Sequence, residues 1–414
     1  MYQFFNRQGI GLISLVQMLN AFLIILRMLV IIKFGGVDTL GVFSLIASMI
    51  TIISIPAYFI NNQKIHSNLI KEKKNQRDVL LKTALVVLLI TSLICSLLVF
   101  CFGIFYTELN KLVKYHIWTS GVASAVLFYF IIAIFELQKI TAGKFLECYV
   151  ATLTGSISSL IFYIYFSDSI VSIAYISSVA YITSYITHCI FNVLEYKRLL
   201  PFSRQPIVFS ALFKLIISSW SLGLIPLINS ALDFVTRILG LIYIGPTQLG
   251  YYQIVVSIEA LVGNIFLGPY YRSILYEYTR SPSFSILILR CKTLIKYIVI
   301  LSLLQIAIFW GVKSLGFIHK ILELMLPIFL AIILRMPSYI WGIFGQALIV
   351  DGKHNYVTLV EVISKIITST FLILLFKINQ DGATSYVYSI LINSILMLVI
   401  VFRVRQHYLV KNSA

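Results

Sequence analysis

Residues 36–43 read Gly-Val-Asp-Thr-Leu-Gly-Val-Phe and lie at the junction of two apolar segments, residues 10–33 and 39–60. Each segment is long enough to cross the roughly 30 Å hydrocarbon core of a bilayer as a helix. Glycines and an aspartate between two apolar runs are typical of a turn. The stretch therefore predicts two membrane-spanning helices joined by a short turn.

The composition extends this pattern to the whole chain. Of its 414 residues, 60% are hydrophobic and only 11% are charged, and the mean hydropathy is +0.97. In soluble domains roughly a quarter of the residues are charged, so we expect an all-α, multi-pass membrane protein. We predict twelve transmembrane helices, over residues 10–33, 39–60, 83–105, 116–138, 145–166, 169–192, 212–243, 248–270, 294–316, 325–349, 356–376 and 383–404.

The net charge of +17 is explained by membrane topology. The side that holds both termini and the segments 61–82, 193–211 and 271–296 carries 22 Lys and Arg, and the opposite side carries six. The positive-inside rule places that richer side, with both termini, in the cytoplasm, and we expect a bacterial inner membrane. The alternative is that the basic segments bind anionic lipid headgroups. Because the chain shows no basic-aromatic domain outside the spans, we expect no nucleic-acid partner.

The opening motif recurs about half a chain later. Gly36-Val-Asp-Thr-Leu-Gly-Val-Phe aligns with Gly245-Pro-Thr-Gln-Leu-Gly-Tyr-Tyr at an offset of 209 residues, with both glycines and the leucine in common. Six predicted spans separate the copies, and because six is even both halves face the same way. Transporters built from such parallel repeats bind their substrate near mid-membrane between the halves. We therefore predict two six-helix lobes, residues 1–204 and 205–414.

The sequence shows no recognisable enzyme active-site motif. No GxSxG, Walker A or HExxH motif and no paired-carboxylate motif is present, and the predicted outer loops span about a dozen residues or fewer. The cysteines and histidines are scattered, so we expect no metal site, no disulfide and no cofactor. A membrane polysaccharide polymerase or glycosyltransferase is a less favoured alternative, because it needs a large outer loop.

Four cations lie well inside predicted spans, Arg27, Arg237, Arg335 and Lys365. The acids there include Asp233, Glu259 and Glu361, and Glu136 and Glu147 lie nearer the span ends. A guanidinium cannot lose its proton, and placing it in hydrocarbon costs at least about 3 kcal/mol. Asp233 and Arg237 are four residues apart, as are Glu361 and Lys365, so each pair either neutralises itself or serves a substrate or ion. Arg27 and Arg335 have no acid three or four residues away.

Their charges admit a functional interpretation. Arg offers planar, bidentate donors to phosphate oxygens, so the four cations are candidates to bind a pyrophosphate. Glu259 lies mid-span with no local cation and is the best candidate for reversible protonation or Na⁺ coupling, with Asp233 and Glu361 as further ion-coupling candidates. The structural alternative for Glu259 is a salt bridge to Arg27 or Arg237.

With these features the chain resembles the multidrug/oligosaccharidyl-lipid/polysaccharide exporter (MOP) superfamily and, within it, bacterial O-antigen flippases of the Wzx type. The resemblance rests on twelve spans, the six-plus-six division and the Gly-x-x-x-Leu-Gly-x-[Phe/Tyr] turn after the first and seventh spans. It implies a V-shaped, two-lobed bundle that carries an undecaprenyl-pyrophosphate-linked oligosaccharide between leaflets by alternating access, coupled to H⁺ or Na⁺. Membrane lipid, a polysaccharide polymerase and a chain-length regulator are the further partners it implies.

The drug-exporter branch of the same superfamily is the main alternative, as a cation-coupled small-molecule antiporter. That branch typically carries an acidic residue in its first span. Here the first span has no acid, and its polar residues include Gln17, Asn20 and Arg27. This departure favours the flippase hypothesis.

Overall fold

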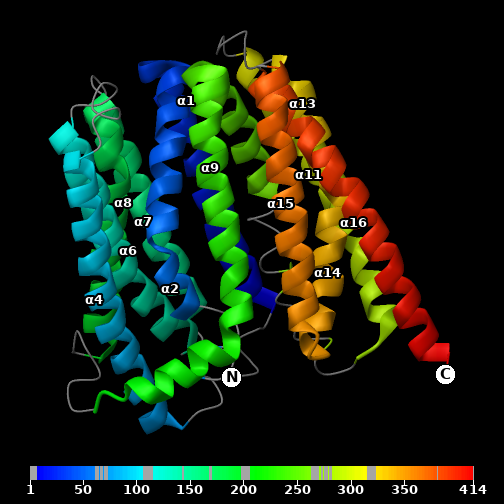
Figure 1. Ribbon diagram of the computed structural model, residues 1–414, viewed down its shortest axis with the longest axis horizontal. Coiled ribbons are helices and arrows are strands. Elements are labelled where there is room, and N and C mark those ends of the chain that lie inside the picture. Colours follow the sequence, from blue (N-terminus) through cyan, green and yellow to red (C-terminus); the bar gives the residue numbers. More distant parts are fainter. Residues whose placement is uncertain are drawn as a thin grey trace. The chain divides into compact units, whose positions relative to one another are not determined.

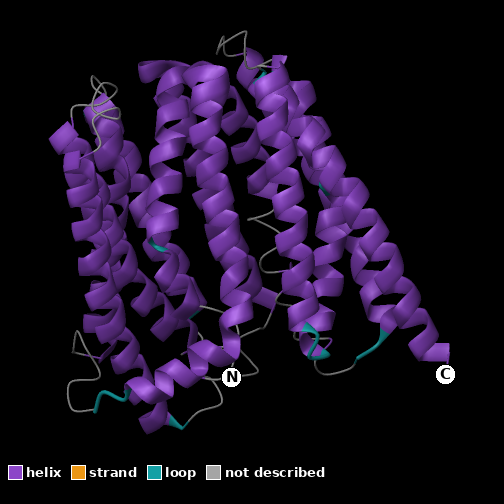
Figure 2. Cartoon of the chain, in the orientation of Figure 1, coloured by secondary structure: helices purple, strands orange, loops and turns teal. Residues whose placement is uncertain are grey.

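The computed structural model describes residues 7–60, 65, 69, 73–105, 115–141, 144–166, 170–196, 206–262, 270–271, 274, 278, 282–314, 323–379 and 381–413. Over these residues the chain is helical, with short connections and no strand (Figure 2). The helices are α1 (Arg7–Ile53), α2 (Ile55–Ile60), α4 (Lys74–Phe105), α6 (Tyr115–Thr141), α7 (Phe145–Tyr165), α8 (Ile170–Tyr196), α9 (Phe209–Val262), α11 (Phe284–Ser314), α13 (Met325–Leu334), α14 (Met336–Val350), α15 (His354–Asn379) and α16 (Gly382–Ser413).

Most of the twelve predicted spans fall on one of these helices or on one arm of α1 or α9. The span 39–60 covers the second arm of α1 together with α2, the span 325–349 is divided into α13 and α14, and the span 248–270 extends past the last described residue of α9, Val262. Within the described residues, eight helices are long and apolar enough to cross a membrane. The protein is therefore a multi-pass, all-α membrane protein. Much of the basic segments 61–82, 193–211 and 271–296 lies outside the described residues, so the orientation of the termini stays a prediction.

The longest helix of the N-terminal half, α1, folds back on itself at Gly36 (Figure 1). Arg27 and Phe43 would lie about 24 Å apart along a straight helix, yet the Arg27 guanidinium is 5.4 Å from the centre of the Phe43 ring. The reversal needs one residue, since Gly36 adopts φ 82° and ψ 172° inside an otherwise helical run. This left-handed φ strains any side chain with a Cβ.

The second copy of the motif has the same backbone. Gly245 adopts φ 76° and ψ 173° inside α9 and folds its two arms together. The leucine that follows each turn is buried, Leu40 in the first copy and Leu249 in the second. A sequence repeat of modest identity thus marks two positions with one conformation, and the predicted connections between the spans, residues 34–38 and 244–247, each reduce to a single glycine.

Contacts between residues divide the chain into two compact units, Met1–Phe234 and Val235–Ala414. In the first unit, α6 packs against α4 and α8, and α7 packs against α1 and α8. The boundary between the units falls inside α9. The predicted lobe boundary at 204/205 rests on the repeat alone and stays a prediction, because residues 197–205 lie outside the described part.

The second unit is organised around α16, which packs against α11, α13, α14 and α15. Its start is fixed by Asp381, whose Oδ1 accepts hydrogen bonds from the backbone N–H groups of Ala383 (3.0 Å) and Thr384 (3.2 Å), as N-cap residues do. The backbone N–H of Gly382 donates to Gln248 Oε1 in the turn of α9 (3.3 Å). The repeat motif therefore docks the beginning of α16.

Candidate functional site

Arg27 lies on the first arm of α1, within the first unit. Its guanidinium stands over the ring of Phe43 on the second arm, 5.4 Å from the centroid, and interacts electrostatically with Tyr181 of α8. Among the described residues no carboxylate lies within ion-pair distance of it. An arginine ring contact of this kind is worth about 0.5–2 kcal/mol, too little to replace a counter-ion for a cation in an apolar helix.

Arg237 occupies nearly the same place in the second fold-back. Its Nη2 donates to Gln253 Oε1 across the turn, at 3.3 Å, and Gln253 Nε2 donates to Ser257 Oγ, at 2.8 Å. The Arg237 Nε is buried and has no hydrogen-bond partner among the described residues. The partner across the turn is therefore a neutral amide, just as it is a neutral ring for Arg27.

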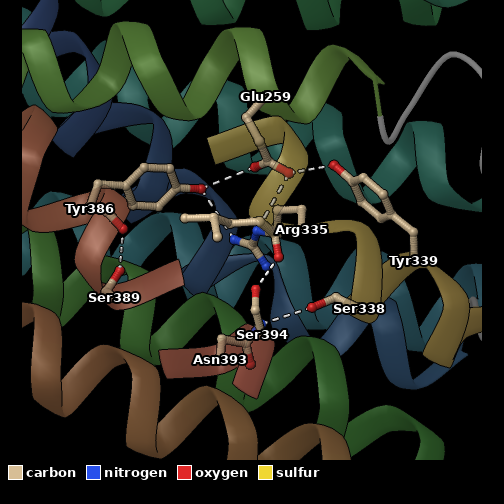
Figure 3. Close-up of polar contacts among 9 residues, drawn as sticks. Glu259, Arg335, Ser338, Tyr339, Tyr386, Ser389, Asn393 and Ser394 are labelled. Carbon is tan, nitrogen blue, oxygen red and sulfur yellow. Dashed lines mark hydrogen bonds and ion pairs between the residues drawn. The ribbon is translucent and has the colours of Figure 1, made fainter. Parts of the chain in front are cut away.

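Glu259 and Arg335 form a different kind of site, inside the second unit (Figure 3). Glu259 Oε1 lies 3.4 Å from Arg335 Nε and accepts a hydrogen bond of 2.6 Å from the Tyr339 hydroxyl. Glu259 Oε2 accepts one of 3.0 Å from the Tyr386 hydroxyl, which in turn accepts one of 3.1 Å from Arg335 Nη2. Both carboxylate oxygens are therefore engaged, by one cation and two hydroxyls.

The helix break at Arg335 brings this arginine to the carboxylate. The chain leaves α13 at Leu334 and enters α14 at Met336, and Pro337 in the first turn of α14 has no N–H to continue the ladder. Beside this break the Leu334 carbonyl accepts a hydrogen bond from the Ser394 hydroxyl of α16, and Asn393 Nδ2 of α16 donates to Ser338 Oγ at 2.9 Å.

The repeat motif reaches the same cluster. Tyr252, the last residue of the second motif copy, packs edge-on against Phe376 and Tyr386, with ring centroids 5.7 Å and 5.3 Å away. This contact sets the ring of Tyr386, whose hydroxyl bonds both Glu259 and Arg335. Glu259 itself follows Tyr252 by about two helical turns on the second arm of α9.

Glu361 and Lys365 lie one turn apart on α15. Glu361 Oε1 accepts a hydrogen bond of 2.7 Å from the indole Nε1 of Trp341 in α14. The carboxylate also interacts electrostatically with Arg335 and Lys365. Glu361 is thus a neighbour of the Glu259–Arg335 pair, held by an indole rather than by a guanidinium.

The structure places the predicted site residues as follows. It brings Glu259 together with Arg335, with Glu361 and Lys365 nearby, while Arg27 lies in the first unit. The sequence analysis offered Arg27 or Arg237 as a salt-bridge partner for Glu259, and this was wrong because the partner is Arg335. Spacing along one helix carries no information about a residue between α13 and α14. Sequence reasoning missed Tyr339, Tyr386, Trp341 and Gln253. The four-residue spacing of Arg335 and Tyr339 could have indicated Tyr339 alone.

The fold of the chain is similar to those of several solved structures. A multidrug resistance MATE family transporter of the MOP superfamily, inward-facing, superposes with a TM-score of 0.72 at 12% identity, over 97% of this chain and 100% of that one. The chain has the MOP superfamily fold. The lipid II flippase MurJ, inward closed, gives a TM-score of 0.70 at 13% identity, over 96% of this chain and 91% of that one.

A third solved structure, the MATE multidrug transporter DinF-BH, gives a TM-score of 0.62 at 12% identity, over 99% of this chain and 98% of that one. No family model and no curated protein matches the sequence. The neighbours with this fold are transporters, not enzymes. Their names state two kinds of cargo, lipid II for one and drugs for the others.

Proposed function

We propose that the protein is a flippase that carries an undecaprenyl-pyrophosphate-linked oligosaccharide, an O-antigen unit or a related polysaccharide repeat, across the bacterial inner membrane. Transport proceeds by alternating access of two six-helix lobes, with both termini in the cytoplasm and with H⁺ or Na⁺ as the coupling ion. The prenyl tail stays in the lipid while the charged headgroup crosses through the protein.

The observation that carries the proposal is the uncompensated charge of Arg27. Its described contacts are an aromatic ring and a tyrosine, and a guanidinium in a membrane span needs an anion or water. A pyrophosphate supplies at least two negative charges and many acceptor oxygens, for which the planar guanidinium is suited. The binding of such a headgroup gives Arg27 the partner that the described part of the fold lacks.

The other predicted residues take roles around this one. Arg237 offers a second guanidinium with a neutral partner, and Arg335 and Lys365 add cations in the second unit. Glu259, Asp233 and Glu361 are the candidate sites for the coupling ion. A cation-coupled small-molecule antiporter is the second candidate function, and the buried, tyrosine-lined carboxylate of Glu259 favours it.

Complementation of a flippase-deficient strain tests the proposal. The wild-type chain is expected to restore surface polysaccharide, and Arg27→Ala or Arg237→Ala to abolish it while the protein still inserts. Lys33→Gln is the matched control, since Lys33 is an exposed cation on the same arm of α1. The flippase hypothesis is abandoned if removing all four cations leaves export intact, and drug resistance without export supports the antiporter.

A further inference from the structure

Arg335 and Glu259 are unequal members of their pair. The Arg335 side chain is 27% exposed and the Glu259 side chain 8%. The Arg335 Nε makes no hydrogen bond among the described residues, so its 3.4 Å contact with Glu259 is electrostatic, looser than the 2.7–2.9 Å of a charge-assisted hydrogen bond. The only hydrogen bond that the structure gives the guanidinium within the described residues is from Nη2 to the Tyr386 hydroxyl. Although its Nε atom is buried, the arginine is thus the more exposed and more loosely held member.

An incoming anion would therefore meet Arg335 first. A phosphate group can form two parallel hydrogen bonds with a guanidinium, which is a better contact than the one that Glu259 makes. Figure 3 shows what remains for Glu259 once Arg335 turns away, namely the hydroxyls of Tyr339 and Tyr386. Both are neutral donors, and a buried carboxylate without a cation is strongly destabilising.

We propose that Glu259 and Arg335 exchange ions: the anionic headgroup takes Arg335, and a monovalent cation takes the place of Arg335 at Glu259. The inference rests on the proposed function, which supplies a pyrophosphate as the anion. Because the two ligands share the cost of separating one ion pair, each raises the affinity of the protein for the other by the same factor. The pair is then the element that couples cargo loading to cation uptake.

The cation is H⁺ or Na⁺, since either neutralises a carboxylate held by hydroxyl groups. Titratable groups on α9, α14, α15 and α16 surround the Glu259–Arg335 pair. They are Tyr252 on α9, Tyr339 on α14, Glu361 and Lys365 on α15, and Tyr386 on α16. Glu361 is the competing carboxylate, and it has its own partner in Trp341.

The test is a binding titration on the purified full-length chain in detergent. The probe is farnesyl pyrophosphate, and farnesol is the uncharged control. Affinity is measured against Na⁺ at fixed pH and, separately, against pH without Na⁺. For the wild type we expect about a tenfold rise in affinity with one of these cations, within the usual range for coupled sites, and none for farnesol.

Variants locate the exchange. Glu259→Gln removes the competing charge and keeps one of the two acceptor oxygens, so one tyrosine hydroxyl still has its acceptor. We expect tight binding that no longer depends on the cation. Tyr386→Phe keeps both charges and loosens Arg335, so affinity rises and cation dependence is kept. Glu147→Gln is the matched control, because Glu147 forms an ion pair with Lys139 in the other unit. It is expected to behave as the wild type.

The outcomes separate the two proposals. Wild-type binding that ignores both Na⁺ and pH overturns the exchange and leaves the flippase standing. The exchange is also overturned if Glu259→Gln keeps the wild-type cation dependence, or if Glu361→Gln, and not Glu259→Gln, abolishes it. If the wild type binds no farnesyl pyrophosphate, the proposed function fails, and the exchange fails with it.

Discussion

Arg27 in the first unit and Arg335 in the second both place a guanidinium group within an apolar segment, yet the surroundings of the two groups differ. Arg335 has a carboxylate, two tyrosines and a helix break that presents it to them. Arg27 has the ring of Phe43 and the nearby Tyr181. Removing one member of a compensated pair leaves the other charge buried and destabilises the fold, whereas removing a charge without a counter-ion does not.

The largest expected effect follows from that contrast. Arg335→Gln strands the buried carboxylate of Glu259 and is expected to lower the free energy of unfolding by about 3–5 kcal/mol. Arg27→Gln removes a charge with no carboxylate among the described residues, so it is expected to leave the melting temperature in detergent unchanged or raised. Equal losses of stability in the two variants contradict the distinction.

A smaller loss is expected at the second fold-back. Gln253→Leu removes the amide acceptor of Arg237 and leaves its guanidinium without that partner, at a cost of about 1–3 kcal/mol. The melting temperature of the purified variant measures it. If Arg237 binds the headgroup, adding farnesyl pyrophosphate recovers part of the loss. Recovery by farnesol to the same extent assigns the effect to the prenyl chain instead.

The two fold-backs, at Gly36 and Gly245, are expected to lose the same stability when the glycine is replaced. A Cβ at Gly36 or Gly245 meets no atom within 4 Å, so Gly→Ala at either position costs only the strain of a backbone conformation that is essentially restricted to glycine, about 1–3 kcal/mol. Gly345→Ala is the control, because this helical glycine has room for a methyl group, with Val357 at 3.7 Å. Unequal costs at Gly36 and Gly245 break the equivalence of the two copies.

The smallest expected effect concerns the ring under Arg27. Phe43→Leu keeps the apolar packing and removes the cation–π contact, at a cost of about 0.5–1 kcal/mol. In a cycle with Arg27→Gln the loss disappears, because the ring then has no cation to face. A loss that persists in the double variant shows that Phe43 acts through packing alone.

The sequence was sufficient for the helices and for the two reversals. Long apolar runs set the spans, because a bilayer imposes a minimum length. The first glycine of each motif copy, Gly36 or Gly245, is the residue of that copy whose φ is positive. The turns were predicted too long, since the pattern Gly-x-x-x-Leu-Gly shows where helices separate but not that one residue suffices.

The polar site could be predicted only in part. Glu259 and Arg335 stood out because charges are rare in apolar spans, but their pairing did not. Tyr339 and Tyr386 lie 80 and 127 residues from Glu259 in sequence, and tyrosines in membrane helices are common enough to carry no signal. Contacts between helices depend on which faces pack together, and periodicity within one helix does not determine that.

The most direct measurement is translocation by the purified chain in liposomes that contain a fluorescent undecaprenyl-pyrophosphate-linked oligosaccharide. Enzymatic cleavage of the glycan in the outer leaflet reports how much lipid has crossed. We expect the wild type and Lys33→Gln to make the whole pool accessible, and Arg27→Gln, though folded, to leave the inner-leaflet half protected. Translocation by Arg27→Gln at the wild-type rate, or none by the wild type, contradicts the proposed role of Arg27 in lipid transport.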